Sequence, residues 1–355
     1  MGTSKSNHGY KFGDMRWVSC NHCGLLQLDS LVPLDVLYKK SHNPAIGKSW
    51  KRHHSYFSKF AVENLGFNTD ICEFGGGNLH IANIISDNEK VRSYEVFDNN
   101  IYSHNNRNEK IIESSGLFDP KTISKKYDVV IHSHTLEHFY DPIGKLQELR
   151  SLLKDNGRMI FSVPNISILL ENNYTNVLNF EHTFFLDKDI LNKILRLSGF
   201  KVIKHENYAL ENSHIDDYCF FVVCEKHEQI IDYDHKHSHI DSVNIFRKFL
   251  NFHYNLISEL NEKLCDKEEK FIFGAHIFTQ YLIEFGLNIE TFKFVLDNDP
   301  SKQNEYLYGY DLIVKSPKVL RDIKNPCLVL RAGQFNQEIK HDIIENINST
   351  VEFLH

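Results

Sequence analysis

The chain has 355 residues, enough for about two domains of ordinary size. Its 40 Lys and Arg residues against 47 Asp and Glu residues leave a net charge of −7, which argues against a nucleic-acid-binding protein. No stretch approaches the roughly 18 apolar residues of a membrane span, and the seven cysteines of so long a chain predict a reduced cytoplasmic protein without a disulfide framework.

In chain order, the sequence divides into four segments. Residues 1–66 form an N-terminal region with a cysteine pair and a stretch rich in histidine and aromatic residues. Residues 67–226 alternate short apolar runs with helical patterns, as βα units do. Residues 227–268 are predicted to be a charged linker and a helix, and residues 269–355 begin a second alternating set. The predicted fold class is α/β, a Rossmann-like sheet with a second, smaller Rossmann-like C-terminal domain.

The predicted strands are short apolar runs between turn residues. They cover residues 71–74, 91–96, 127–132, 158–163 and 218–224 in the larger block, and residues 270–274, 292–297 and 327–330 in the C-terminal block. A helix is predicted over residues 243–264, because its apolar residues recur on one face.

A glycine-rich turn, Glu73-Phe74-Gly75-Gly76-Gly77, follows the first strand of the larger block. Glycines let the backbone turn sharply and approach a ligand, and the next helix offers free N–H groups. A dinucleotide site favours G-x-G-x-x-G, but the third glycine is missing here. The Glu73 carboxylate would repel a pyrophosphate and suits an ammonium group, which favours S-adenosylmethionine (SAM) over NAD. The alternative is an ordinary strand-to-helix turn.

The second strand ends in acids, with Glu95 placed 22 residues after Glu73. A carboxylate near this position accepts the hydroxyl protons of a ribose in dinucleotide sites. Asp98 is the alternative if the strand runs longer, and either acid could instead belong to a solvated turn.

The fourth strand carries the most specific motif, which begins at Tyr127 and reads Y-D-V-V-I-H-S-H-T-L-E-H-F-Y-D-P. Together with the glycine loop and the acids of the second strand, it resembles class I SAM-dependent methyltransferases. The turn over residues 152–158 matches that family's L-K-x-G-G, whereas Leu79 stands where the family often has a third glycine. The resemblance implies a class I methyltransferase fold and SAM as the cofactor.

The same resemblance implies roles for individual residues. It places Glu73, Gly75 and Gly77 at the methionine end of SAM, Glu95 or Asp98 at the ribose, Gly116 and Leu117 near the adenine, and His132 and His134 along the floor of the cofactor site.

The C-terminal block, residues 269–355, points to one group within the methyltransferases that the sequence resembles. Residues 271–276, 294–303 and 335–339 follow the motif order of the C-terminal domain in nucleotide-sugar C-methyltransferases, with Asn304 in place of a glycine. This resemblance implies an activated, nucleotide-linked sugar as substrate and a role in polysaccharide or glycan synthesis. The alternative is a degenerate Rossmann half that only packs against the first.

Members of that family begin with a zinc-binding domain that has two C-x-x-C pairs, whereas this chain has one, Cys20 and Cys23. A tetrahedral structural site needs four ligands. The sequence therefore favours a reduced, knuckle-like turn over a zinc site, and it assigns no other metal ligand.

Catalytic residues are predicted in the segment N-F-E-H at residues 179–182, which resembles the family's Y-H-E-H segment. By this resemblance, His182 is the general base and Glu181 orients it. A histidine with a pKa of about 6.5 is largely neutral at pH 7 and can take a proton. The residues expected to face the substrate are Tyr38, His53, His54 and Asn179.

Three alternatives stay open. Because Asn179 replaces the family's tyrosine, O- or N-methylation of a sugar or of another small metabolite competes with C-methylation. A non-catalytic module would have a damaged cofactor loop, but this loop keeps its acid and glycines. An NAD-dependent sugar-modifying enzyme would show G-x-x-G-x-x-G near the start and a Tyr-x-x-x-Lys pair, and neither occurs. The oligomeric state does not follow from the sequence.

Overall fold

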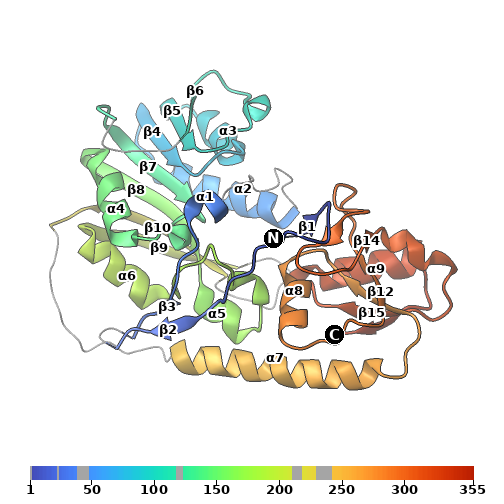
Figure 1. Cartoon of the computed structure of the whole chain (residues 1–355). Helices are drawn as coiled ribbons and strands as arrows, with labels where there is room; N and C mark the ends of the chain where they lie inside the picture. The colour runs from blue at the N-terminus through green and yellow to red at the C-terminus, as the bar shows by residue number, and fades with distance from the viewer. Residues whose placement is uncertain (1, 22–23, 38–47, 117–122, 210–217, 229–241) are drawn as a thin grey trace. The chain divides into compact units, whose positions relative to one another are not determined.

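The structure, a computed structural model, describes residues 2–21, 24–37, 48–116, 123–209, 218–228 and 242–355. The chain folds into two compact units, which Figure 1 colours by position along the chain. The larger unit comprises Met15–Leu169 and Asn179–Ser242. The C-terminal unit comprises Met1–Asp14, Leu170–Leu178 and Val243–His355.

The larger unit is built on a sheet whose described strands lie in the order β6-β5-β4-β7-β8-β10-β9. In chain order these strands are β4 (Thr69–Phe74), β5 (Val91–Asp98), β6 (Ile111–Ser115), β7 (Tyr127–Ser133), β8 (Leu153–Pro164), β9 (Phe200–Tyr208) and β10 (Cys219–Lys226). Neighbouring strands are parallel, except that β10 is antiparallel to β8 and to β9. The strand order reverses between β4 and β7, which is where open α/β sheets bind ligands.

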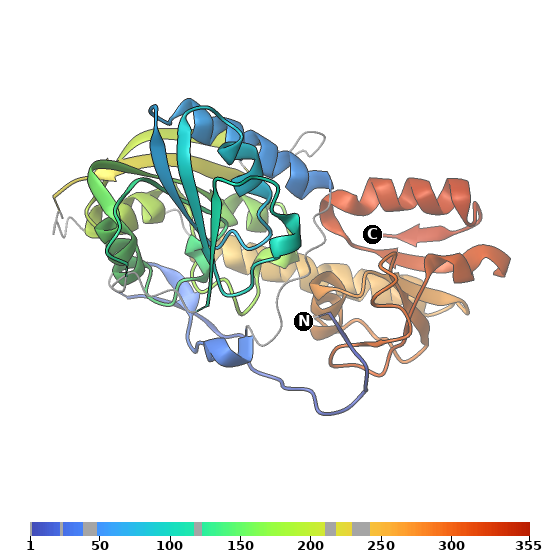
Figure 2. The same ribbon diagram turned by 90° about the horizontal axis from the view of Figure 1, so that it is seen from above.

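Helices cover both faces of this sheet, as buried parallel strands require. One face carries α2 (Lys48–Glu63) and α3 (His80–Ser86), and the other carries α4 (Pro142–Ser151) and α6 (Lys188–Leu197) (Figures 1 and 2). Phe57, Ile85 and Ile131 are fully buried in the core between α2, α3 and the strands. The connecting segments contain η1 (Ser103–Asn105), η3 (Leu136–His138) and α5 (Ile166–Glu171).

A short hairpin precedes the sheet in the larger unit. Its strands β2 (Trp17–Ser19) and β3 (Leu26–Leu28) pair antiparallel, and α1 (Leu34–Leu37) follows. The backbone N–H of Leu28 donates to the carbonyl of Thr183 at 2.9 Å, and that of Phe185 donates to Leu26 at 2.7 Å. The hairpin therefore fixes the segment that directly follows Glu181 and His182.

The C-terminal unit has its own parallel sheet, in the order β14-β12-β11-β15-β16 among the described strands. These strands are β11 (Lys270–Phe273), β12 (Phe292–Leu296), β14 (Val314–Lys315), β15 (Cys327–Leu330) and β16 (Glu352–Leu354). Separate apolar cores join α7 (Ser242–Leu264) and α8 (Ile277–Glu284) to one face, and η5 (Pro317–Asp322) and α9 (Asn336–Asn346) to the other. In the same unit, β1 (Thr3–Ser4) pairs with β13 (Tyr306–Leu307). The unit also contains the short helices η4 (Thr175–Val177) and η6 (Gly333–Phe335).

The predicted α/β fold class is confirmed, and the structure adds strands that the sequence patterns missed. Both added strands of the larger sheet, β6 and β9, lie at its edges. In β9 charged residues such as Lys204 and Glu206 interrupt the apolar pattern, as is usual for an edge strand. The segment 152–158, predicted as a turn, instead opens β8 at Leu153.

The described helices include none that could cross a lipid bilayer. The longest, α7, has 23 residues, but it carries charged residues such as Arg247 and Lys248, which are exposed.

An ion-pair network joins β4, β5 and β8 near the amino end of β4. Arg92 donates from Nε to Oδ1 of Asp70 at 2.7 Å, and Lys154 Nζ lies 3.4 Å from the second carboxylate oxygen. The hydrogen bond from Arg92 lowers the pKa of Asp70 well below its usual value, although burial acts in the opposite direction.

Asp70→Asn is therefore expected to lower the melting temperature at pH 7 and to matter less in acid. A carboxyl with a lower pKa in the folded state stabilises the fold above its unfolded pKa of about 3.9, and this contribution is lost as the pH falls toward the folded pKa. Thermal unfolding of both proteins at about pH 7 and about pH 3 measures the effect. A difference in melting temperature that stays the same at both pH values would contradict a role for the charge of Asp70.

Candidate active site

The carboxyl ends of β4, β5 and β7 meet at one edge of the larger sheet. The glycine loop follows β4, Asp98 ends β5, and His134 and Thr135 follow β7. Since the strand order reverses between β4 and β7, these residues lie where such sheets bind ligands.

The glycine loop is packed so closely that side chains do not fit. Gly75 has a φ of +82°, and a Cβ there would lie 2.8 Å from Oγ1 of Thr135. A Cβ on Gly77 would lie 2.3 Å from the backbone oxygen of Asn100. Both glycines are therefore required by local geometry, and the loop presents bare backbone to its surroundings.

Glu73 lies beneath this loop. Its side chain is buried, and its Oε2 accepts a hydrogen bond of 2.8 Å from the hydroxyl of Tyr94. A Cβ on Gly76 would lie 2.3 Å from its carboxyl carbon. Burial raises the pKa of Glu73 to about 7, despite the opposing hydrogen bond from Tyr94. The carboxyl group thus supports the loop from inside the fold.

Of the two acids on the second strand, the structure brings Asp98 to the glycine loop. The Asp98 carboxylate accepts a 3.0 Å hydrogen bond from the backbone N–H of Gly77. Glu95 lies in the middle of β5, where it accepts a 2.6 Å hydrogen bond from the Tyr127 hydroxyl and pairs with Lys125 at 3.3 Å. Because β5 continues to Asp98, the strand is long enough for the alternative that the sequence left open.

Two further residues of this edge have left-handed backbones. Leu79, at the position of the family's third glycine, has a φ of 60° and a ψ of 11°, a conformation that costs most residues energy. Gly116 follows β6 with a φ of +120°, and its N–H donates to the backbone oxygen of Asp98 at 3.2 Å. Leu117, predicted near the adenine, lies outside the described residues.

The two histidines predicted along the cofactor floor lie in different surroundings. His132 is fully buried and stacks on Phe161 with ring centroids 4.7 Å apart. Neither of its ring nitrogens has a hydrogen-bond partner among the described residues, and burial lowers its pKa to about 3. His134 has a φ of 50°, and its Nδ1 lies 3.4 Å from Oε1 of Glu137.

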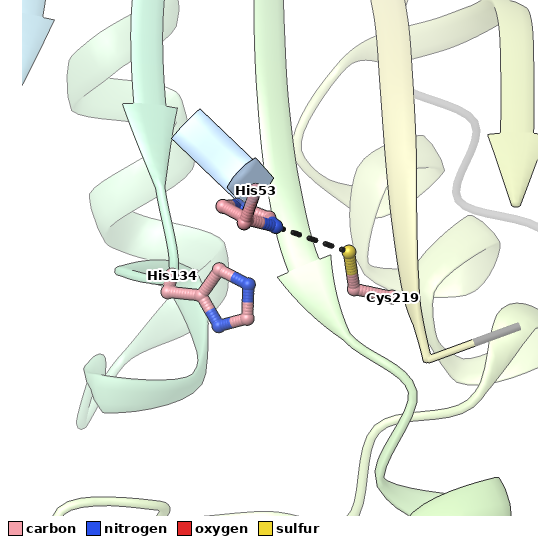
Figure 3. Close-up of side chains that lie close together, drawn as sticks. All are labelled: His53, His134 and Cys219. Carbon is pink, nitrogen blue, oxygen red and sulfur yellow. Dashed lines mark hydrogen bonds between the residues drawn. The ribbon is translucent and has the colours of Figure 1, made fainter. Parts of the chain in front are cut away.

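His53, predicted to face the substrate, is packed inside the larger unit. Figure 3 shows it on α2, beside His134 and Cys219 of β10. Its Nδ1 lies 3.7 Å from Sγ of Cys219, and its Nε2 lies 3.2 Å from Oγ of Ser162 and 3.3 Å from Oγ of Ser133. Burial lowers the pKa of His53 well below its usual value, so this imidazole is neutral at pH 7.

The remaining predicted substrate residues fall in three places. His54 is also buried, and its Nδ1 lies 3.3 Å from Nδ1 of His80. Asn179 accepts hydrogen bonds through Oδ1 from the backbone N–H groups of Glu181, at 2.8 Å, and His182, at 2.9 Å. It therefore shapes the turn that carries the predicted catalytic pair. Tyr38 lies outside the described residues.

Glu181 and His182 lie beside the end of β7. The His182 ring packs edge-on against His138, with centroids 5.1 Å apart. Oε2 of Glu181 lies 3.5 Å from Nδ1 of His138. On its other side, Nε2 of His138 lies 3.8 Å from Oε1 of the buried Glu137.

Glu137 and His138 belong to the motif that begins at Tyr127, and the sequence predicted no role for either of them. The available signal was the repeat of one dipeptide, Glu-His, at residues 137–138 and 181–182. No pattern pointed to Cys219, which reaches His53 only through the fold.

The cysteine pair of the N-terminal region is described in part. Cys20 lies between β2 and β3, where its backbone N–H donates to Leu25 at 2.8 Å. Cys23 lies outside the described residues, so the preference for a turn without zinc stays a prediction.

The C-terminal unit contains a polar pocket of about 160 Å³. Its lining includes Arg331, whose pKa is lowered by burial and which forms no ion pair with an acid among the described residues. His253 also lines it, with Nδ1 bonded to the carbonyl of Phe249 at 2.9 Å and Nε2 without a partner in the described chain.

A family model described as a methyltransferase domain matches residues 47–205. No curated protein matches the chain. A SAM-dependent methyltransferase from Clostridium acetobutylicum shares 12% identity over 54% of this chain and 96% of its own, with a TM-score of 0.39. The N-methyltransferase NodS from Bradyrhizobium japonicum, in complex with S-adenosyl-L-homocysteine, shares 10% identity over 51% of this chain and 88% of its own, with a TM-score of 0.39. Magnesium protoporphyrin IX methyltransferase from Synechocystis shares 13% identity over 54% of this chain and 94% of its own, with a TM-score of 0.40.

The residues at the sheet edge fit SAM. Bare glycine backbone follows the first strand of the sheet, where a Cβ on Gly77 would meet neighbouring backbone, and a carboxylate ends the second strand beside it. The sheet has a class I arrangement, in which β10 lies between β8 and β9 and is antiparallel to both. Residues 47–205 thus form a methyltransferase domain of the class I type, and the chain is a methyltransferase that uses S-adenosylmethionine.

Proposed function

We propose that this enzyme methylates an activated, nucleotide-linked sugar in polysaccharide or glycan synthesis. In this proposal, SAM binds at the carboxyl ends of β4 and β5, and His182 with its neighbours promotes loss of the acceptor's proton. Residues 67–226 are proposed as the SAM-binding domain and residues 269–355 as a Rossmann-like domain, joined by the linker and helix of residues 227–268.

The observation that carries the proposal is the position of the Glu181–His182 segment. The backbone N–H of Thr183 donates to the carbonyl of Glu137 at 3.1 Å, which ties this segment to the turn after β7. Thr135, in the same turn, lies against Gly75 of the glycine loop. A group able to take up a proton is therefore held close to the loop proposed to bind the donor.

Bound SAM supplies a methyl group on a positively charged sulfur, which an electron pair of the acceptor displaces in line. Such a displacement depends on alignment and on a deprotonated acceptor atom, and a neighbouring imidazole can accept that proton. This requirement is the same for an oxygen, nitrogen or carbon acceptor, so all three acceptors are included in the experiment below.

The polar pocket of the C-terminal unit has, within that unit, the chemistry of a phosphate-binding site. Arg331 offers a positive charge without an acidic partner among the described residues, and cations of this kind bind phosphate well. Nε2 of His253 can accept a hydrogen bond from a sugar hydroxyl, because Nδ1 already donates to Phe249.

We assign the ribose contact to Asp98 in place of Glu95. Asp98→Asn is expected to weaken SAM binding by about 10- to 100-fold, because hydrogen bonds from the ribose hydroxyls to a charged acceptor contribute about 1.5–3 kcal/mol. Glu95→Gln is expected to change the affinity less than about threefold, since Glu95 bonds to Tyr127 within the sheet. Calorimetric titration with SAM measures both, and a larger loss for Glu95→Gln would reverse the assignment.

The experiment that tests the function is incubation of the enzyme with SAM and a panel of nucleotide sugars, free sugars and small amines. Mass spectrometry is expected to show a gain of about 14 Da, one CH₂ equivalent, on a nucleotide sugar. Methylation confined to a free sugar or an amine would replace the proposed acceptor class, and bound NAD with no methylated product would contradict the proposal.

A further inference from the structure

Glu137 is an unusual residue for a buried position. Its side chain has no solvent exposure, yet neither of its carboxylate oxygens accepts a hydrogen bond from the described residues. A buried carboxylate without hydrogen bonds is costly unless a positive charge lies beside it. Around it lie the imidazoles of His134, His138 and His182.

Glu137, His138 and His182, called here the Glu137 cluster, have the geometry of a metal site. Each can offer one ligand atom, and the three atoms lie within 4.8 Å of one another. Ligand atoms around one transition-metal ion lie about 3–4 Å apart, at about 2.0–2.2 Å from the metal. Small side-chain rotations would therefore complete the site.

The orientation of His138 supports this interpretation. Its Nε2 faces Oε1 of Glu137 at 3.8 Å, and its Nδ1 faces Oε2 of Glu181 at 3.5 Å. A histidine that binds a metal usually donates its other ring N–H to a carboxylate, which fixes the tautomer and the direction of the ring. Glu181 is in place to accept that hydrogen bond.

Hydrogen bonds hold the two Glu-His segments, residues 137–138 and 181–182, next to each other. Thr183 donates through its N–H to the carbonyl of Glu137 at 3.1 Å and through Oγ1 to the carbonyl of Phe139 at 3.0 Å. Its own carbonyl accepts from Leu28 of β3 at 2.9 Å. Metal sites need ligands fixed by such a supporting shell.

A neighbouring group, His53, His134 and Cys219, also has three potential ligand atoms within the same distance limit (Figure 3). Here the ligand atoms already have partners, since Nε2 of His53 meets Ser162 at 3.2 Å and its Nδ1 meets Cys219. Burial raises the pKa of the Cys219 thiol well above its usual value, which disfavours the thiolate that metals bind. The group of His53, His134 and Cys219 is therefore not proposed as a metal site, and it serves as a control in the metal titration below.

We propose that Glu137, His138 and His182 bind a divalent transition-metal cation, with Glu181 supporting His138. Two imidazoles and one carboxylate suit Zn²⁺, Mn²⁺ or Co²⁺ better than Mg²⁺, which prefers oxygen ligands. Three protein ligands leave coordination positions open, as in catalytic metal sites.

The chemistry of such a cation deepens the proposed function and rests on it. Neighbouring hydroxyls of a sugar can fill the open positions, and the cation then stabilises the alkoxide of a bound hydroxyl. The proton leaves to water, an O–C bond forms with the methyl group, and the C–S bond of the sulfonium breaks. This chemistry favours O-methylation of a sugar. In the metal-bound enzyme His182 is a ligand, and the cation that it holds takes over from its imidazole the promotion of proton loss from the acceptor.

The test is a Co²⁺ titration of the full chain after treatment with a chelator, followed by visible absorption and elemental analysis. Wild type and Cys219→Ala are expected to bind one Co²⁺ with d–d absorption bands. Glu137→Gln and His182→Ala are each expected to lose about 100-fold or more in affinity, and Glu181→Gln about 10-fold. Exposed His341 supplies a control, and His341→Ala is expected to match wild type.

Circular dichroism and SAM titration establish which variants remain folded. If Glu137→Gln does not fold, Glu181→Gln tests the metal site in its place. Equal Co²⁺ affinity in wild type, Glu137→Gln and Glu181→Gln, or loss in Cys219→Ala alone, would overturn the site. Undiminished methyl transfer by the chelated enzyme would overturn the catalytic role of the cation while leaving the proposed function intact. Co²⁺ binding at the Glu137 cluster with no sugar methylated would support the site and contradict the proposed function.

Discussion

Gly77→Ala is expected to weaken SAM binding by about 100-fold or more, the cost of misplacing a binding group by about 1 Å. The added Cβ would lie 2.3 Å from the backbone oxygen of Asn100 and 2.8 Å from Cγ of Asp98. The shortest of these contacts is to a backbone oxygen, which cannot yield as a side chain can, so the backbone has to move. The N–H of Gly77 bonds to the Asp98 carboxylate at 3.0 Å, so the same movement displaces the group proposed to hold the ribose.

Calorimetric titration with SAM measures this loss, and Gly66→Ala is its matched control. Gly66 precedes β4, and the nearest atom to a Cβ there is Oγ1 of Thr69 at 4.0 Å. We expect Gly66→Ala to bind SAM within about twofold of wild type. Wild-type affinity in Gly77→Ala would mean that the cofactor does not use this loop.

His182→Ala is expected to reduce methyl transfer by about 10²- to 10⁴-fold, the usual contribution of a residue that assists proton transfer. SAM affinity is expected to stay within about threefold of wild type, because His182 belongs to the turn after η4 and not to the glycine loop. Initial rates at saturating SAM, together with a SAM titration, separate the two effects.

His341→Ala is the control for this substitution, since His341 is an exposed histidine of α9. It is expected to keep wild-type rates. Full activity in His182→Ala would remove His182 from the reaction, whereas lost SAM binding in that variant would show that the substitution disturbs the larger unit as a whole.

The larger sheet was predictable where its strands are mostly apolar and buried. Residues 71–74 and 127–132 lie within the central strands β4 and β7, and apolar residues predominate in both runs although Glu73 and Asp128 interrupt them. The edge strands β6 and β9 were missed, because one face of an edge strand meets water and its sequence includes charged residues such as Lys204.

The candidate site was predictable only as far as local sequence determines it. The glycine loop and its preceding acid follow from backbone geometry that a strand-to-helix turn requires. The choice between Glu95 and Asp98 depends on where β5 ends, and strand ends are set by pairing with neighbouring strands, such as that of Asp98 with Ser115.

The polar clusters could not be predicted, because they join distant parts of the chain. His53 meets Ser162 and Cys219 only after α2 packs against the sheet. Glu137 meets His182 through the backbone contact with Thr183, and the repeated Glu-His dipeptide does not by itself show that the two segments meet. The roles predicted for His53 and Asn179 came from a resemblance, whereas their observed contacts are internal to the fold.

The most direct measurement is a calorimetric titration of the wild-type enzyme with SAM and, separately, with NAD. One SAM bound per chain and no heat from NAD is the expected result, because the glycine loop after β4 lacks the third glycine of a dinucleotide site and residues 47–205 match a methyltransferase domain. Binding of NAD without binding of SAM would contradict the donor site and, with it, the proposed reaction.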